Sequence, residues 1–243
     1  MRNAPENSRA AISAAQAFDM VEIDVRLSAD GVPFIMHDED LWRTAGRRDR
    51  VSQLTAAELS ASPLFGIPET VPRLDEALQA AGPALYVDVD VKEARELGQV
   101  AAYLASTDAT HRVMLKKDVT DDDSIAELQA IEAQHGIPVI AKLPLSTEAD
   151  LNLVAALFDA GVLAAEVAFS KVDLVAAACA TGLPISVYTL DEIACDGFSA
   201  ARGRRDPASV WGHLAEIGVR LLMTDAPEIA QAYLKTTKAP PAT

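Results

Sequence analysis

The sequence is poor in the features that stabilise small secreted domains or hold a chain in a membrane. Its only cysteines are Cys179 and Cys195, which are too few for a disulfide framework or a cysteine-rich metal cluster. No apolar run approaches the roughly 20 residues that span a bilayer, and residues 1–8 lack the apolar core of a signal peptide. We therefore expect two reduced thiols and no stable insertion into a membrane.

Basic residues are scarce relative to acidic ones. The chain has 21 Lys and Arg against 36 Asp and Glu, which gives a formal net charge of −15. A protein of this charge repels nucleic acids and anionic membrane surfaces at long range. A bound cation can reverse the potential inside one pocket, so a small phosphate substrate is still compatible with this balance. We expect no nucleic-acid partner.

Short β-like runs alternate with amphipathic helical stretches along the whole chain. Strands are predicted at residues 21–27, 85–91, 113–115, 139–142, 163–167, 185–189 and 221–224. Helices are predicted at residues 8–18, 73–81, 94–106, 122–134, 148–160, 171–181, 207–217 and 227–235. This alternation is typical of βα units around a parallel sheet. We expect an α/β fold of the TIM (β/α)8-barrel type, as a single domain at residues 1–235 with a flexible tail at residues 236–243.

The first predicted element is a helix, whereas a closed barrel begins with a strand. We therefore expect the first strand of the barrel to precede residue 1 of this chain. An open, doubly wound sheet is the alternative, because it also alternates strands with helices.

Two segments depart from the simple repeat. Asp30 and Gly31 divide the first strand region, and Asp-Gly is a strong hairpin signal. Residues 196–206 form a long polar insertion before the last predicted strand, and it carries Arg202, Arg204 and Arg205. These arginines could gate a pocket or bind an anion, although solvent exposure is the commoner state of such a cluster.

Carboxylates are spaced two residues apart in two predicted strands. Glu22 pairs in this way with Asp24, and Asp88 with Asp90, so each pair shares one face of its strand. Several acids in a barrel interior repel one another, and a hard divalent cation such as Mg²⁺ or Ca²⁺ would relieve the repulsion. Lys92 lies on the face of Asp90 and could hold a phosphate oxygen or orient the acids. The alternatives are acids that only cap loops and a lysine in solvent.

His37 is the histidine best placed for catalysis. It ends VPFIMH (residues 32–37), the second of the two runs into which Asp30 and Gly31 divide the first strand region, on the face where barrel enzymes carry out their chemistry. His111 and His135 precede predicted strands, and His213 lies in a predicted helix. Imidazole titrates near neutrality and can act as a general acid or base, although a single histidine is more often structural.

Several further segments, taken in order along the chain, carry a family pattern. They are PENS (residues 5–8), VEIDVRLSADGVPFIMHDEDLWRTAG (21–46), VPRLDEAL (71–78), VDVDVK (87–92), VYTLDE (187–192) and GVRLLMTDAPE (218–228). Together they resemble the glycerophosphodiester phosphodiesterase family over nearly the whole chain. The resemblance implies a metal-dependent enzyme of lipid metabolism. Such an enzyme cleaves glycerophosphodiesters, or related small phosphodiesters, to sn-glycerol 3-phosphate (or another phosphomonoester) and an alcohol.

The resemblance also implies roles for single residues. Glu22 and Asp24 match metal ligands, and Asp90 stands where the family usually has a glutamate ligand. The metal implied is a divalent cation, Mg²⁺ or Ca²⁺. Because aspartate is one methylene shorter than glutamate, we expect the ion to sit closer to Asp90 or to bind it through water.

His37 matches one of the two catalytic histidines of the family. The other belongs to a His-Arg pair just upstream of the PENS segment. Arg2 can be that arginine and contact the phosphate, but Met1 stands in the position of the histidine. Since one general acid–base group contributes about 10²–10⁴-fold in rate, we expect the natural product to extend upstream and a chain that starts at Met1 to be nearly inactive.

Other polar residues are candidates for substrate contact. Lys116 and Lys142 are expected at strand ends, and Glu166 and Tyr188 in the following strands. If these side chains face the mouth of the barrel, they favour a polar head group such as glycerol or a sugar. Lysines in solvent are the alternative. Trp42 and Tyr188 are expected to border the pocket.

Two other functions are compatible with the sequence. A catalytically impaired barrel that binds phosphodiesters or metal would account for Met1 and Asp90. A Mg²⁺-dependent lyase or enolisation enzyme could also use carboxylates with a lysine, but Arg2 and the PENS segment would have no clear role in such an enzyme. Both cytoplasmic and exported locations are compatible, because any export signal would lie upstream.

Overall fold

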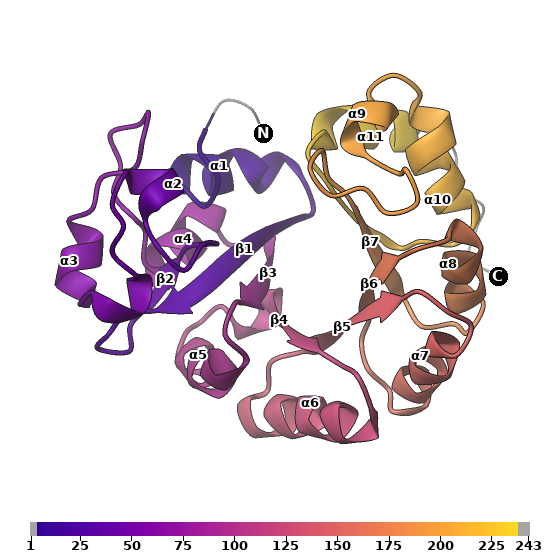
Figure 1. Cartoon of the computed structure of the whole chain (residues 1–243), viewed down its shortest axis with the longest axis horizontal. Helices are drawn as coiled ribbons and strands as arrows, with labels where there is room; N and C mark the ends of the chain where they lie inside the picture. The colour runs from indigo at the N-terminus through magenta and orange to yellow at the C-terminus, as the bar shows by residue number, and fades with distance from the viewer. Residues whose placement is uncertain (1–3, 238–243) are drawn as a thin grey trace. The chain divides into compact units, whose positions relative to one another are not determined.

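The computed structural model describes residues 4–237, drawn in colour in Figure 1. The chain divides into two units by its internal contacts. Unit 1 comprises Met1–Lys117 and Ala130–Val139, and unit 2 comprises Asp118–Gln129 and Ile140–Thr243. Residues 1–3 and 238–243 lie outside the described part of the chain, and they include Met1, Arg2 and most of the expected tail.

Unit 1 contains four strands in the order β2-β1-β3-β4. They are β1 (Met20–Leu27), β2 (Pro33–Ile35), β3 (Tyr86–Val91) and β4 (Val113–Asp118). β1 pairs with β3 and β3 with β4 in parallel, whereas β1 pairs with β2 in antiparallel register. The antiparallel pair confirms the hairpin predicted at Asp30 and Gly31, and Gly31 takes the positive φ of 79° that this turn requires.

Some helices of unit 1 precede or connect these strands, and others form a small lobe after β2. They are α1 (Arg9–Ala14), η1 (Ala15–Ala17), α2 (Trp42–Ala45), η2 (Val51–Gln53), α3 (Ala56–Ser60), α4 (Leu74–Ala81), η3 (Ala94–Glu96), α5 (Leu97–Ala105) and η4 (Thr110–Arg112). The lobe that contains α2, η2 and α3 has its own apolar cluster, which consists of Phe34, Met36, Leu41, Val51, Leu54, Leu59, Leu64 and Val71.

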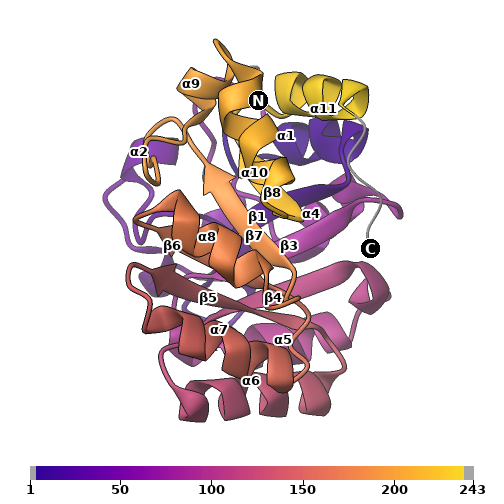
Figure 2. The same ribbon diagram turned by 90° about the vertical axis from the view of Figure 1, so that its right-hand side faces the viewer.

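Unit 2 contains the parallel strands β5 (Val139–Leu145), β6 (Ala165–Phe169), β7 (Ile185–Thr189) and β8 (Leu221–Thr224), in that order. Its helices are α7 (Asp150–Asp159), α8 (Val172–Cys179), α9 (Ala200–Gly203), the π-helix η5 (Ala208–Gly212), α10 (His213–Glu216) and α11 (Pro227–Thr236). Helix α6 (Asp122–His135) begins in unit 2 and ends in unit 1. Helix α8 packs against β6 and β7 (Figure 2), which is the βα arrangement that the alternating sequence predicts.

The strands and helices predicted from the sequence are present, with shifted ends. β4 continues to Asp118 and β5 to Leu145, so Lys116 and Lys142 lie within strands and not at strand ends as predicted. Cys179 is half-buried, Cys195 is buried, and both are free thiols. Within residues 4–237, no helix combines the length and the apolarity needed to cross a membrane.

The short helices α2, α3 and α9 were not predicted. Each has four or five residues, which is little more than one turn and too short to show a helical period in the sequence. A capping box marks α3, because the Thr55 side chain accepts a bond from the backbone of Glu58 and the Glu58 side chain accepts one in return.

Gly203→Ala is expected to destabilise unit 2. A Cβ at Gly203 would lie 2.5 Å from the ring of Trp211. That ring is 1% exposed and is held in place because its Nε1 donates to Thr189 Oγ1 at 3.1 Å. We expect a loss of about 1–3 kcal/mol in the free energy of unfolding, as for other overpacked cores, measured by urea denaturation.

Gly98→Ala is the matched control for this substitution. Gly98 lies in α5, and a Cβ there would meet nothing within 4 Å. Alanine should therefore stabilise this helix by about 0.5–1 kcal/mol. Equal effects of the two substitutions would show that Trp211 is not tightly packed against α9.

Candidate metal centre

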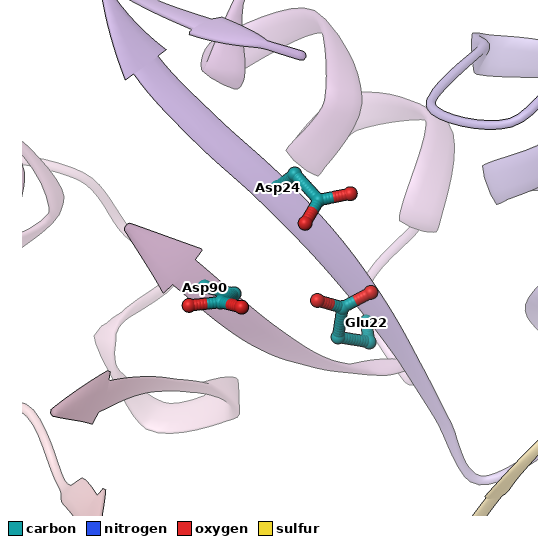
Figure 3. Close-up of side chains that lie close together, drawn as sticks. All are labelled: Glu22, Asp24 and Asp90. Atoms are coloured by element: carbon teal, nitrogen blue, oxygen red, sulfur yellow. The ribbon is translucent and has the colours of Figure 1, made fainter. Parts of the chain in front are cut away.

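Three carboxylates from β1 and β3 converge on one point (Figure 3). Glu22, Asp24 and Asp90 each offer one oxygen atom, and these oxygens lie within 4.8 Å of one another. The parallel register places Asp24 directly beside Asp90, and Glu22 shares the face of Asp24 because it lies two residues earlier. Ile23 and Val25 point to the opposite face, where both are buried. Burial of this apolar face fixes the carboxylates on the other.

Burial and mutual repulsion make the cluster unfavourable without a cation. The pKa of Glu22 is raised from 4.5 to about 8, chiefly because burial disfavours its charged form and then because Asp24 is charged nearby. The cation of Lys116 acts in the opposite direction, but it is the weaker influence. Without metal, Glu22 therefore keeps its proton at neutral pH. A divalent cation with a preference for oxygen ligands would displace that proton.

Lys92 neutralises part of this charge. Its Nζ donates to Asp24 Oδ1 at 3.0 Å and to Asp90 Oδ2 at 3.2 Å. Burial disfavours the ammonium charge, but the two carboxylates outweigh this effect and raise the pKa of Lys92. The prediction that Lys92 lies on the face of Asp90 is confirmed, and its alternative as a lysine in solvent is wrong.

Lys116 is buried beside Asp88. Its side chain is 1% exposed, and its Nζ lies 3.0 Å from Asp88 Oδ2 and 3.9 Å from Glu22 Oε1. The alternative of a solvated strand-end lysine is therefore wrong for Lys116. Asp88, the fourth acid of the two strands, is thus part of an ion pair and lies outside the group of three that could hold a metal.

Asn7 is a site residue to which the sequence analysis gave no role. Its Nδ2 donates to Asp24 Oδ2 at 2.7 Å, and its Oδ1 accepts a bond from the Asp24 backbone N–H at 3.3 Å. Asn7 adopts a φ of 53°, a left-handed conformation that asparagine tolerates better than most residues. The adjacent Ser8 side chain caps α1 by accepting from Ala11 N–H. The PENS segment therefore orients one carboxylate of the cluster. Its inclusion in the family pattern was the only sequence signal for this contact.

His37 lies just beyond the short strand β2. The backbone N–H of Met36 donates to the carbonyl of Asp24 at 2.9 Å. His37 therefore directly follows a residue whose backbone is bonded to a member of the acidic cluster. Its Nδ1 lies 2.8 Å from Asp38 Oδ1, and its side chain is 52% exposed. Of the other histidines, His111 lies in η4, His135 ends α6 and His213 begins α10, so among residues 4–237 His37 alone follows a strand.

The remaining candidates for substrate contact lie on other elements. Lys142 on β5 has a half-exposed side chain whose Nζ is 4.0 Å from Asp118 Oδ1. Glu166 on β6 is buried, and Tyr188 on β7 is half-buried with its pKa raised by burial and by Cys195. Trp42 is exposed, with the guanidinium of Arg48 lying 4.6 Å from its ring centroid. Substrate contact by Lys116, Lys142 and Tyr188 stays a prediction, as does a pocket bordered by Trp42.

These observations define an α/β barrel-type protein with an acidic centre suited to a divalent cation. The family model described as "Glycerophosphoryl diester phosphodiesterase family" matches residues 1–229. The chain belongs to this family. Its membership confirms the resemblance inferred from the sequence.

Known relatives agree with this assignment. The "Probable glycerophosphodiester phosphodiesterase 2" of Mycobacterium tuberculosis is 30% identical over 113 residues, which cover 46% of this chain and 42% of that protein. The match therefore spans less than half of the relative's length.

Solved structures show the same fold. The glycerophosphodiester phosphodiesterase of Agrobacterium tumefaciens superposes with a TM-score of 0.68 at 23% identity, covering 95% of both chains. A phosphodiesterase of Oleispira antarctica, solved with the product sn-glycerol-3-phosphate, gives a TM-score of 0.70 at 20% identity, covering 96% of this chain and 92% of that chain. The expected TIM-barrel type of fold is confirmed, and the open doubly wound alternative is wrong. An additional strand before residue 1 stays a prediction.

Glu22→Gln is expected to stabilise the metal-free protein at alkaline pH. The folded pKa of Glu22 is about 8 against an ordinary 4.5, so the folded state binds this proton more tightly than the unfolded state. Stability is therefore lost as the pH rises from 4.5 to 8, and uncharged glutamine removes this loss. Thermal unfolding in EDTA should show a larger advantage of the variant at about pH 9 than at about pH 5.

The exposed residue Glu192 provides the control, because Glu192→Gln makes the same chemical change away from the cluster. Excess Mg²⁺ should reverse the order of wild type and Glu22→Gln, since only the intact site gains binding free energy. An advantage of Glu22→Gln that does not change with pH would contradict the assignment of the raised pKa to Glu22.

Metal affinity is expected to depend on pH through the same proton. Because binding must displace the proton of Glu22, whose pKa is about 8, the dissociation constant should fall by up to about tenfold per pH unit below this value and level off above it. Calorimetric titration with Mg²⁺ and Ca²⁺ in buffers of different ionisation enthalpy measures both the affinity and the released proton. Asp24→Asn and Asp90→Asn should weaken binding, whereas the exposed Asp49→Asn should not. Binding without proton release would show that Glu22 is already ionised in the metal-free protein.

Proposed function

We propose that this chain is a metal-dependent phosphodiesterase that hydrolyses glycerophosphodiesters, or related small phosphodiesters, to sn-glycerol 3-phosphate (or another phosphomonoester) and an alcohol. The observation that carries the proposal is the convergence of Glu22, Asp24 and Asp90 in a member of this family. The solved relative from Oleispira antarctica with bound sn-glycerol-3-phosphate supports the same product class.

The donor set of the cluster fits a hard divalent cation. It consists of three carboxylates, and Mg²⁺ and Ca²⁺ prefer such oxygen ligands. Burial, and then the nearby charge of Asp24, raise the pKa of Glu22, and a bound cation would offset both effects by stabilising the charged carboxylate. When bound, the cation supplies Lewis-acid stabilisation of phosphate charge and a template for the substrate.

The side chains of this chain perform the remaining tasks. Lys92 lies against two of the three carboxylates, and once their charge is neutralised its ammonium is the adjacent donor for a phosphate oxygen. Lys116 keeps Asp88 neutralised in the interior. His37 is half-exposed and transfers the proton that the leaving alkoxide requires. Asn7 keeps Asp24 oriented toward the cluster.

A second function is favoured by the distribution of histidines. Within residues 4–237, His37 is the one histidine that follows a strand, and a single acid–base group cannot serve the nucleophile and the leaving group in the same step. A barrel that binds phosphodiesters with little turnover would require no second group. The two functions differ in the rate of product release and not in metal affinity.

The test is the release of alcohol from glycerophosphocholine and a panel of other glycerophosphodiesters, with Mg²⁺, Ca²⁺ or EDTA. Release should require the metal, and His37→Ala should lower the rate by about 10²–10⁴-fold, the contribution of one acid–base group. His111→Ala is the control, because His111 lies in η4 before β4. A form extended upstream by a strand that ends in His-Arg should be faster by a similar factor. No release from either form, with His37→Ala without effect, would favour the binding function.

A further inference from the structure

A series of charged side chains ends at the imidazole of His37. Asp38 Oδ1 lies 2.8 Å from His37 Nδ1 and 2.9 Å from Arg43 Nη2, and Asp38 Oδ2 lies 2.8 Å from Arg43 Nε. The same Nη2 of Arg43 donates to Glu6 Oε1. The order of contacts is therefore Glu6, Arg43, Asp38 and His37. Because Arg43 binds both oxygens of Asp38 in the fork geometry of a guanidinium, the plane of this carboxylate is fixed.

The charge state of Asp38 decides which nitrogen of His37 carries hydrogen. The hydrogen bonds from Arg43 are the main reason that the pKa of Asp38 falls to about 2, so this carboxylate is ionised at all working pH values. An ionised carboxylate can only accept hydrogen bonds. The ring nitrogen that faces it, Nδ1, must therefore donate. In the neutral ring the free electron pair then lies on Nε2.

The backbone of His37 is held as well. Arg26 Nε donates to the His37 carbonyl at 2.9 Å, and Arg26 Nη1 pairs with Glu93 at 3.2 Å. The preceding residue, Met36, donates its N–H to the Asp24 carbonyl. The carbonyl and Nδ1 of His37 are thus both bound, although its side chain is half-exposed and would otherwise sample several rotamers. Such restraint reduces the entropy lost when the ring aligns with a reacting group.

The same short segment holds the metal centre and the histidine. Glu6 binds Arg43, which holds Asp38, and the next residue, Asn7, binds Asp24 of the acidic cluster. Adjacent residues of the chain therefore contact the acidic cluster and the series of side chains that ends at His37.

We propose that Asp38, clamped by Arg43, is a positioning residue that holds His37 in its Nδ1–H form and leaves Nε2 as the atom that exchanges protons with the substrate. The catalytic part of this inference rests on the proposed function, whereas the form of the ring does not.

The ring form is read directly from long-range ¹H–¹⁵N correlation spectra of protein labelled at histidine. The spectra are recorded at alkaline pH, where imidazole is neutral, and the His37 signals are identified by their loss in His37→Asn. We expect the pattern of an Nδ1–H imidazole in the wild type. In Asp38→Ala we expect a shift toward the Nε2–H form, which imidazole favours in water. Arg43→Met, which keeps Asp38 but removes its clamp, is the second variant if Asp38→Ala does not fold, and it should give a mixture.

Asp49→Ala is the matched control. Asp49 lies between α2 and η2, in the same lobe as Arg43. It is also bound by an arginine, because Arg47 Nε donates to its Oδ2 at 3.0 Å. The variant therefore loses an arginine-bound acid that is not part of the series Glu6, Arg43, Asp38 and His37. Its spectrum should match the wild type. A wild-type ring in the Nε2–H form, or a ring form unchanged in Asp38→Ala, would overturn the inference.

Kinetics separate this inference from the proposed function. With glycerophosphocholine and Mg²⁺, Asp38→Ala should lower kcat by about 10- to 100-fold, as for carboxylates that orient metal-binding histidines, with little change in KM. If His37→Asn leaves hydrolysis unchanged, the proposed role of His37 in catalysis fails, and the Nδ1–H form in the spectra still supports the positioning by Asp38.

Discussion

The polar interior of unit 1 depends on one constraint. Carboxylates of like charge lie side by side on the neighbouring strands β1 and β3. The register of β1 and β3 places Asp24 beside Asp90 and Glu22 beside Asp88. These acids cannot move apart, because the opposite faces of both strands are buried in the apolar core. Removing carboxylates from water and bringing them together is costly, so each must gain a counter-charge, a proton or a hydrogen-bond donor.

The surrounding residues meet this requirement in different ways. Lys116 compensates Asp88 in the interior, and Lys92 bridges Asp24 and Asp90 nearer the solvent. Asn7 donates to Asp24, whereas Glu22 keeps its proton. Compensation by lysines is incomplete, and the remaining charge is what a divalent cation would neutralise. In the metal-free state the carboxylates of this site repel one another, and a bound divalent cation would remove that repulsion. Stability, proton uptake and metal affinity are therefore linked through the same atoms.

The sequence was sufficient to predict that acids of β1 and β3 lie together, because that signal is local, whereas the choice of Glu22, Asp24 and Asp90 as metal ligands came from the family resemblance and stays a prediction. Acids two residues apart in a β-run must share a face, and parallel strands bring such faces together. The contact from Asn7 to Asp24 could not be predicted in this way, because the residues are 17 positions apart and no period relates them. The burial of Lys116 was missed for a different reason: β4 is longer than the apolar run that predicts it, so a lysine expected at the end of a strand lies inside the sheet. The lobe of α2 and α3 was missed because single helical turns have no detectable period.

Glu22, Asp24 and Asp90 are proposed to hold one divalent cation. The decisive experiment uses crystals grown or soaked with Mn²⁺ and measured at a wavelength where manganese scatters anomalously. We expect one strong anomalous peak within coordination distance of all three carboxylates, absent in Asp24→Asn crystals. A strong peak elsewhere, with none between these carboxylates at saturating Mn²⁺, would contradict it.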